Sequence, residues 1–414
     1  MPEQYDVIIV GAGVAGVSAA YHLTKAGYKD GRSPNILVID GGPSAGEGWG
    51  PRKSGTATMN DSPISKIKMM TQLFAVPAVE DFARHHGAEG ALAKELQTDC
   101  SQDEEILTEM GSYYVCYPKD RDDLYTEYQF YKKFDCCKDW QFVDTDHMSG
   151  VSGSSPDFSH GIYFPDDAVI DSSEYAKRLL KSLTSKEDST VTTLFNTKVT
   201  KILDNKRSGG VVILESGETL NANDVVVATG ALGFAVTQLH GLIKPCYSYL
   251  ADVSIDNPRY GSVEESANFF TWGYSHDWCF TGGKVRVSGE DHFSAYKEHR
   301  CEERCGRMID WVRTRYKCDP IDDSGKRSIP QQYGLYSETP DAAPLVGKIS
   351  DDSSLCYLLG CNAWGQAILS CCASLVPGIL ASTGTNGGAE SGLTKFQQDL
   401  FKIMDLRRFS ELPH

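Results

Sequence analysis

Three glycines near the start of the chain have the spacing of a nucleotide-binding turn. Gly11, Gly13 and Gly16 follow the apolar run at residues 6–10 and open a helix-like stretch. In such a turn the first glycine makes the bend, the second lets the main chain approach a pyrophosphate, and the third lets the helix pack on the strand. The N–H groups at the helix start then hold the phosphates. The residues predicted to bind a dinucleotide here are Gly11, Gly13, Val14, Ala15 and Gly16.

A carboxylate stands at the end of the next expected strand. That strand covers residues 36–39 and is followed by Asp40, slightly beyond the usual spacing of about 20 residues after the glycine turn. A carboxylate in this place accepts hydrogen bonds from both ribose hydroxyls of an adenosine, which favours a 2′-OH over a 2′-phosphate. The combination predicts dinucleotide binding; the alternative is a glycine turn in an unrelated α/β unit.

The elements that must position this site continue through the middle of the chain. Residues 172–184 have the pattern of a helix whose N-cap is Asp171 or Ser172. We expect strands at 192–195 and 197–203, a hairpin over 211–220, and a buried strand from residue 223 that ends in Thr229 and Gly230.

Two segments near the C-terminus carry a family pattern. Residues 338–347 read Glu-Thr-Pro-Asp-Ala-Ala-Pro-Leu-Val-Gly, and an apolar strand at 355–359 leads into 360–366, which opens a helix. With the N-terminal glycine turn and the strand ending at Thr229, this resembles the D-amino-acid oxidase, glycine oxidase and sarcosine oxidase superfamily of FAD enzymes. Those proteins carry TPD-x-x-P-x-(I/V)-G, then a strand, then G-x-x-x-x-G before the last helix.

The resemblance implies an α/β fold with two parts. One is a Rossmann-like FAD-binding domain, three-layered with a mostly parallel sheet, assembled from residues 1–90, 165–240 and 335–414. The other is a mixed antiparallel-sheet substrate domain from 91–164 and 241–334. The chain length of 414 residues suits two domains.

The resemblance also implies which residues meet the flavin. Ser54, Gly55 and Thr56 lie in a loop that wraps the pyrophosphate and ring, and the Val199 backbone contacts adenine. Thr229 and Gly230 are also expected to bind the cofactor. Near the pyrimidine end, a helix N-terminus faces the edge where charge builds on reduction; the alternative is that Gly365 only permits a sharp turn. The residues expected there are Gly360, Asn362, Ala363, Trp364, Gly365 and Gln366.

FAD is expected to be noncovalent. Monomeric sarcosine oxidases bond the flavin to a cysteine five residues before the threonine of the TPD motif, and Gly334 holds that position here. Cys361 remains the alternative site for a covalent link.

Candidate catalytic residues are Arg52, Lys53, Tyr336 and Trp364. Arg52 and Lys53 would hold a substrate anion or offset charge on the reduced flavin; the alternative is that they are solvated loop residues. Tyr336 and Trp364 would form an aromatic wall of the pocket; the alternative is that they belong to the packed core. The family's usual carboxylate anchors are replaced by Ala363 and Ala367. Replacement anchors would be Tyr336, Arg327, Arg286 and Arg52; otherwise the substrate is not a simple α-amino acid.

The expected activity is oxidation of a C–N bond in an amine or amino-acid-like small molecule, by hydride transfer to flavin N5. O2, giving H2O2, or another electron acceptor would reoxidise the flavin. The alternative is an FAD-dependent dehydrogenase or biosynthetic tailoring oxidase with a non-amino-acid substrate. An NAD(P)-dependent reductase is disfavoured, because no second GxGxxG appears in mid-chain.

Composition limits the partners. The formal net charge of −16 repels phosphate backbones, so no nucleic-acid partner is expected. No run approaches the roughly 20 apolar residues that span a bilayer, and a strand begins almost at once, so we expect no membrane insertion and a cytoplasmic location. Cys301 and Cys305 lack a second pair with zinc-ligand spacing, so no metal site is predicted.

Overall fold

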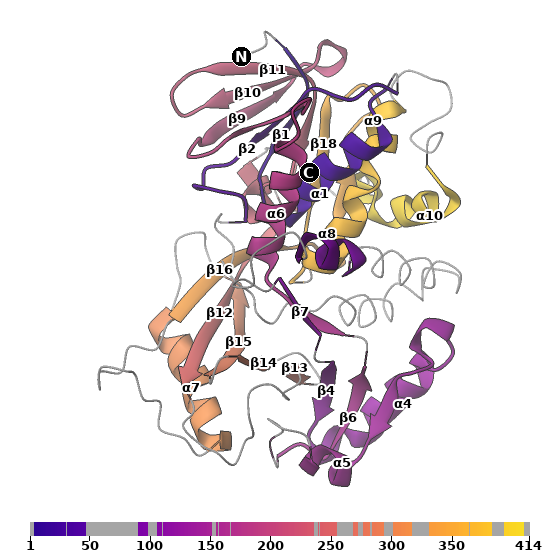
Figure 1. The fold of residues 1–414 in the computed structure, drawn as a ribbon, viewed down its shortest axis with the longest axis vertical. Helices are drawn as coiled ribbons and strands as arrows, with labels where there is room; N and C mark the ends of the chain where they lie inside the picture. The colour runs from indigo at the N-terminus through magenta and orange to yellow at the C-terminus, as the bar shows by residue number, and fades with distance from the viewer. Residues whose placement is uncertain are drawn as a thin grey trace.

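The computed structural model describes residues 4–29, 31–46, 90–97, 106–109, 111–150, 155, 157–165, 167–235, 239, 241–254, 268–271, 276–281, 284–293, 301–316, 331–363, 365–382 and 393–409. Two eight-stranded sheets dominate this part of the chain. Figure 1 shows them one above the other, with β16 rising from the lower sheet toward the upper one. The predicted fold class, α/β with a Rossmann-like part and a mixed sheet, is confirmed.

The upper sheet is mostly parallel. Its main path runs β17, β18, β11, β1, β2, β8, and all neighbours on this path except β17 and β18 pair in parallel. All six residues of β1 are buried, as in a strand covered on both faces. The strands are β1 (Tyr5–Val10), β2 (Ile36–Ile39), β8 (Val191–Leu194), β9 (Val199–Asp204), β10 (Gly210–Leu214), β11 (Thr219–Val227), β17 (Leu345–Gly347) and β18 (Leu355–Leu359).

Each face of the upper sheet has its own apolar core. On one face, residues such as Val7 and Ile9 pack against helices, and on the other Ile8 and Val10 pack against the β9–β10 hairpin. The result is three layers. The helices are α1 (Val14–Ala26), α6 (Ser172–Thr184), α8 (Gly365–Ala373), α9 (Val376–Ala381) and α10 (Lys395–Met404).

Strand β11 differs from the expected pattern. The sequence predicted a short hairpin strand and a separate strand from residue 223, but Thr219–Val227 is continuous. Its first half pairs antiparallel with β10, and its second half pairs parallel with β1. The polar residues at 221 and 223 lie on the exposed side of the alternation, so they do not interrupt the strand.

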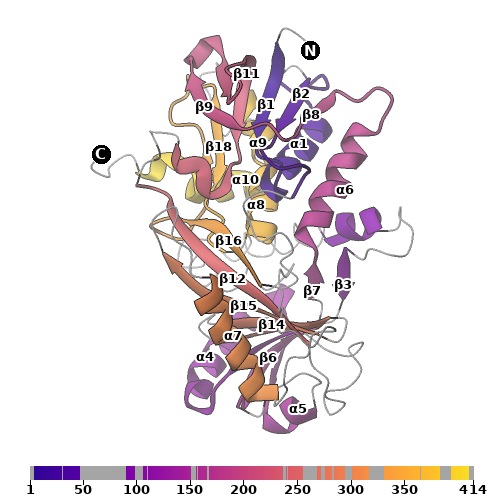
Figure 2. The ribbon, with the colours of Figure 1, turned by 90° about the vertical axis from the view of Figure 1, so that its left-hand side faces the viewer.

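The lower sheet is antiparallel except where β13 pairs in parallel with β4. Helix α7 covers one face, where Trp278, Met308 and Val312 are fully buried (Figure 2). The strands are β4 (Ser112–Cys116), β5 (Gln141–Val143), β6 (His160–Phe164), β12 (Lys244–Ser254), β13 (Asn268–Thr271), β14 (His276–Thr281), β15 (Lys284–Phe293) and β16 (Gln331–Glu338). The sheet therefore extends through β16 to Glu338; the domain boundaries remain a prediction.

The smaller elements lie around these sheets. They are α4 (Arg121–Tyr131), α5 (Thr145–Gly150), α7 (Cys301–Tyr316) and the two-stranded sheet of β3 (Leu107–Glu109) and β7 (Ala168–Ile170). Asp171 is the N-cap of α6, because its carboxylate accepts a hydrogen bond from the Glu174 N–H at 2.9 Å. Among the described helices none is both long and apolar enough to cross a membrane.

Helix α1 packs on the turn that follows β1 with almost no space between the two backbones. A Cβ on Gly16 would lie 1.8 Å from the Gly11 carbonyl oxygen. Gly11 has φ +110°, and a Cβ there would lie 2.3 Å from the Ala228 carbonyl oxygen at the end of β11. Gly11 and Gly16 are therefore required where the glycine turn, α1 and the end of β11 pack against one another.

Gly16→Ala should destabilise the fold by on the order of 3 kcal/mol, because the added methyl group collides with backbone that cannot rotate away. Gly306→Ala is the control: nothing of the described chain lies within 4 Å of a Cβ at this position in α7. That control should gain up to about 1 kcal/mol from helix propensity. Urea unfolding measures both, and equal stabilities for the two variants would contradict the packing argument.

Candidate active site

Gly13 differs from its two neighbouring glycines. Its φ of −73° is open to any residue, and no atom of the described chain lies within 4 Å of a Cβ built on it. The packing of the described residues does not require a glycine here. A bare backbone at the N-terminus of α1, beside free space, fits the close approach of a pyrophosphate.

Asp40 is fixed beside this turn by two backbone donors. One carboxylate oxygen accepts from the Ala12 N–H and the other from the Gly42 N–H, each at 2.7 Å. A carboxylate has about four lone-pair sites, so each oxygen can accept one further hydrogen bond. This arrangement fits the predicted contact with two ribose hydroxyls.

The other predicted nucleotide-binding segments reach the same edge of the sheet. The Thr197 N–H donates to the Asp40 carbonyl at 3.0 Å, which brings the start of β9 at Val199 toward this turn. The Ala228 N–H donates to the Val10 carbonyl, and the next residue, Thr229, has a buried hydroxyl with no partner in the described chain. Gly230 follows with φ +58°. Ligands bind at the carboxyl ends of strands in open α/β sheets, and these segments meet there.

The loop between β18 and α8 has an unusual backbone. Gly360, Asn362 and Ala363 all have φ between 50° and 77°. For Ala363 this left-handed conformation costs on the order of 1 kcal/mol. The buried Asn362 side chain holds the loop: it accepts from the Thr339 N–H at 2.9 Å and donates to the Gly360 carbonyl at 2.6 Å.

Gln366 lies in the first turn of α8 and is 7% exposed. Neither its amide oxygen nor its amide nitrogen has a hydrogen-bond partner among the described residues. Leaving such a group unpaired costs about 1–3 kcal/mol. A ligand that presents both an acceptor and a donor would satisfy it, and the pyrimidine end of a flavin presents both.

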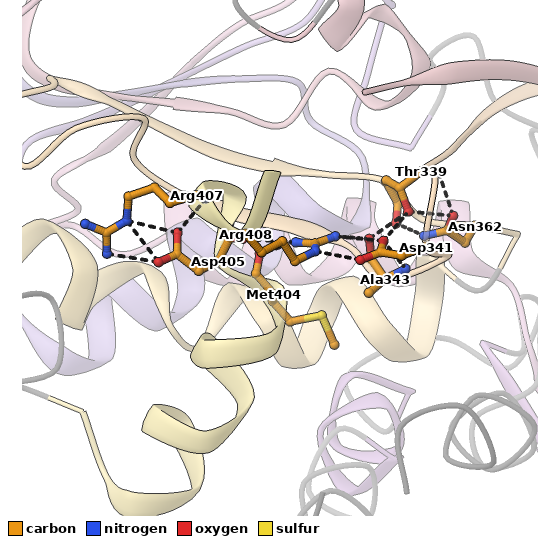
Figure 3. A network of polar contacts seen from close by, with 9 residues as sticks. Thr339, Asp341, Ala343, Asn362, Met404, Asp405, Arg407 and Arg408 are labelled. Carbon is orange, nitrogen blue, oxygen red and sulfur yellow. Dashed lines mark hydrogen bonds and ion pairs between the residues drawn. The ribbon is translucent and has the colours of Figure 1, made fainter. Parts of the chain in front are cut away.

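A polar network ties this loop to the C-terminal end of the described chain (Figure 3). Arg408 donates to both oxygens of Asp341, at 2.8 and 3.0 Å, and to the Ala343 carbonyl at 2.8 Å. Thr339 donates to the same carbonyl at 2.8 Å. Burial raises the pKa of Asp341, but the hydrogen bonds and charge of Arg408 outweigh burial and hold that pKa below its usual value.

The network makes the TPD segment rigid. Asp341 also accepts from the Ala343 N–H, and Ala342 between them has φ 58°. Since Thr339 in turn fixes Asn362, the ion pair at Arg408 supports the loop that leads into α8. We call residues Thr339, Asp341, Asn362 and Arg408 the TPD clamp.

Tyr336 lies in β16 on the sheet face opposite α7. Its hydroxyl donates to Asp291 at 2.9 Å and to Glu338 at 3.2 Å. Burial, with a further contribution from the Asp291 charge, raises the pKa of this phenol. Hydrogen bonds to Asp291 and Glu338 therefore fix the position of the Tyr336 ring. Its role as a pocket wall remains a prediction.

Arg286, a candidate carboxylate anchor, is already engaged. Its guanidinium forms a two-pronged ion pair with Asp252 on the neighbouring strand, at 2.6 and 2.7 Å. Two-pronged pairs of this kind are strong and fix the guanidinium plane. The remaining candidates fall outside the described residues: Arg52, Lys53, Ser54, Gly55, Thr56, Arg327 and Trp364.

Sequence reasoning missed three residues of this region: Asp277, Asp291 and Arg408. Arg408 gives no local signal, because only the fold brings it to Asp341. Asp277 precedes a tryptophan in a strand, and the two-residue alternation of strands would have placed it opposite the apolar face.

No group of three metal-ligating side chains is found within the described part of the chain.

A sequence model of the family described as FAD dependent oxidoreductase matches residues 6–376. The chain belongs to this family. It is therefore an FAD-dependent oxidoreductase, as the sequence predicted, and the glycine turn, Asp40 and Gln366 offer groups that fit the cofactor. No curated protein sequence matches the chain.

Solved structures share the fold at low sequence identity. Glycine oxidase from Geobacillus kaustophilus is 18% identical, with a TM-score of 0.72 over 93% of this chain and 96% of that one. L-proline dehydrogenase from P. horikoshii is 16% identical, with a TM-score of 0.68 over 99% of both chains. L-amino acid deaminase from Proteus vulgaris is 14% identical, with a TM-score of 0.66 over 99% of this chain and 95% of that one.

Arg408→Ala should weaken FAD binding, because the TPD clamp loses the ion pair that fixes Asp341. We expect the FAD dissociation constant of the apoprotein to rise about tenfold, equivalent to about 1.4 kcal/mol. Fluorescence titration of the apoprotein with FAD measures it.

Arg407→Ala is the matched control. It removes the same charge from the adjacent residue, but Arg407 pairs with Asp405 and Asp351, outside the clamp. Its FAD affinity should stay within about twofold of wild type, since exposed pairs contribute little. Equal losses in the two variants would show that the clamp does not act on the cofactor site.

Proposed function

We propose that this FAD-dependent oxidoreductase oxidises a carbon–nitrogen bond of an amine or amino-acid-like small molecule. The observation that carries the proposal is the fold, shared over 93–99% of the chain with glycine oxidase, L-proline dehydrogenase and L-amino acid deaminase. The names of those enzymes place their substrates among amino acids.

When bound, FAD would supply the acceptor for a hydride from the C–H beside the nitrogen, and the imine formed would take up water to give a carbonyl compound and an amine. In this chain Gly13 and the first N–H groups of α1 would hold the pyrophosphate, and Asp40 the ribose. Gln366 and the N-terminus of α8 would hold the pyrimidine end, where a helix terminus favours negative charge.

We propose that FAD is held without a covalent bond. Gly334 offers no side chain for a link. Cys361, the alternative, lies in the loop between β18 and α8, with its sulfur 3.9 Å from the Ser337 carbonyl oxygen of β16. For the electron acceptor we propose O2, which would take two electrons and two protons to give H2O2.

A second candidate is an FAD-dependent dehydrogenase or tailoring oxidase acting on a substrate that is not an amino acid. The ion pair between Arg286 and Asp252 favours it, because that guanidinium is not free to bind a substrate carboxylate. The described part of the lower sheet offers no other arginine on this face.

Anaerobic mixing with a panel of primary amines, secondary amines, amino acids and 2-hydroxy acids separates the candidates. The flavin released by acid precipitation first establishes that the holoenzyme carries noncovalent FAD. We expect amines, and not hydroxy acids, to reduce the flavin and so abolish the absorption of blue light by its oxidised form. Bleaching by hydroxy acids alone would contradict the proposal and support the second candidate.

A further inference from the structure

The lower sheet presents a polar face opposite α7. In β14 Trp278 is buried against α7, so the preceding residue, Asp277, lies on the other face. Cys279 pairs with Arg286 and Asp277 with Ser288, which places these residues together.

This polar face is turned toward the upper part of the molecule. Hydrogen bonds to Asp252 raise the pKa of Arg286, and the charge of Asp171 adds a smaller contribution. Asp171 is the N-cap of α6 in the upper three-layered part. The same face continues along β16 to Tyr336, which precedes Thr339 of the TPD clamp by three residues.

Asp277 is the unsatisfied group on this face. One of its carboxylate oxygens is shut off from solvent and has no hydrogen-bond partner among the described residues. Burial, with the nearby charge of Asp291, raises the pKa of this carboxyl to about 8. Near pH 7 this carboxyl is therefore mostly protonated in the free protein. A buried carboxylate oxygen without a partner is costly, and a cation beside it would favour the ionised form and remove that cost.

The neighbouring groups do not supply that cation within the described chain. Arg286 is paired with Asp252, and Asp291 accepts its hydrogen bond from Tyr336. His276, adjacent to Asp277, stacks on Trp311 of α7, and burial lowers its pKa to about 4, so it is neutral near pH 7. Burial raises the pKa of Asp291, but Asp291 also accepts a hydrogen bond from Ser248, and this bond and the charge of Arg304 act against the effect of burial. Asp277 has no such compensation among the described residues, because burial and the Asp291 charge both raise its pKa.

We propose that Asp277 binds a cationic group of the substrate, separate from the nitrogen beside which the C–H is oxidised. The substrate class is then a diamine or another amine with a second positive charge, rather than an α-amino acid. Asp291 and Glu338 add negative potential along the same face and repel a carboxylate. This inference rests on the proposed amine oxidation and names the substrate class of that site.

The test compares three series of N-methylamines of increasing chain length. One series ends in an ammonium group, the second in a methyl group of similar size, and the third in a carboxylate. For the holoenzyme we expect the highest kcat/KM with the ammonium series. Asp277→Asn should lower kcat/KM for that series roughly 10- to 100-fold and leave the methyl series nearly unchanged.

Asp310→Asn is the matched control. It makes the same Asp-to-Asn change in α7, where the Asp310 side chain is 73% exposed and pairs with Arg313 of its own helix. Its substrate preference should equal that of wild type. Asp277→Asn should melt at or above the wild-type temperature, because it removes an unpaired buried acid, so loss of folding does not account for the expected effect.

Binding of an alkyltrimethylammonium ion separates this inference from the proposed function. The ion is a permanent cation without a nitrogen lone pair, so its binding, followed by calorimetry, does not depend on oxidation. Binding to wild type and Asp310→Asn that is lost in Asp277→Asn supports the inference even if no amine bleaches the flavin. Preference for the carboxylate series, or equal cation binding by all three proteins, would overturn it.

Discussion

The proposed site in the upper part of the molecule depends on the close approach of the glycine turn, α1 and the end of β11. The Gly11 carbonyl in this turn occupies the space that a Gly16 side chain would need, and Gly11 itself lies against the end of β11. Parallel pairing brings the carboxyl ends of β1, β2 and β11 to one edge of the sheet. Asp40 and Thr229, which we propose to contact the nucleotide, follow two of these strands. The apolar side chains of both layers then stabilise an arrangement that the glycines make possible.

The second half of the site comes from the far end of the chain, and its support is electrostatic. The loop before α8 holds left-handed backbone at Asn362 and Ala363, which a free loop would not keep. The TPD clamp holds it through Asn362, Thr339 and the ion pair between Asp341 and Arg408 (Figure 3). Below it, the polar face of the lower sheet adds acidic groups rather than a free arginine. In the proposed arrangement, a cofactor site in the upper part of the molecule thus lies above an acidic substrate face.

Much of this arrangement could be predicted from the sequence, and the reasons are local. The apolar runs at 6–10 and 36–39, the glycine spacing and the acid at residue 40 are short-range signals, as are the N-cap at Asp171 and the TPD segment. The continuous β11 could not be predicted, because polar residues at its midpoint resemble a turn until the pairing partners are known. Arg408 and Asp277 were missed for a related reason. Their roles depend on residues far away in the sequence, and a single arginine or aspartate carries no pattern of its own.

The central claim is that Gly13 is a glycine for the sake of the cofactor and not of the fold. The most direct measurement is the FAD affinity of the Gly13→Ala apoprotein, together with its free energy of unfolding without FAD. The free energy of unfolding should change by no more than about 1 kcal/mol, the difference between glycine and alanine at a helix N-cap. The FAD dissociation constant should rise at least about tenfold, because the methyl group enters the space of the pyrophosphate. Wild-type FAD affinity in a folded Gly13→Ala protein would show that the cofactor does not require glycine at this position.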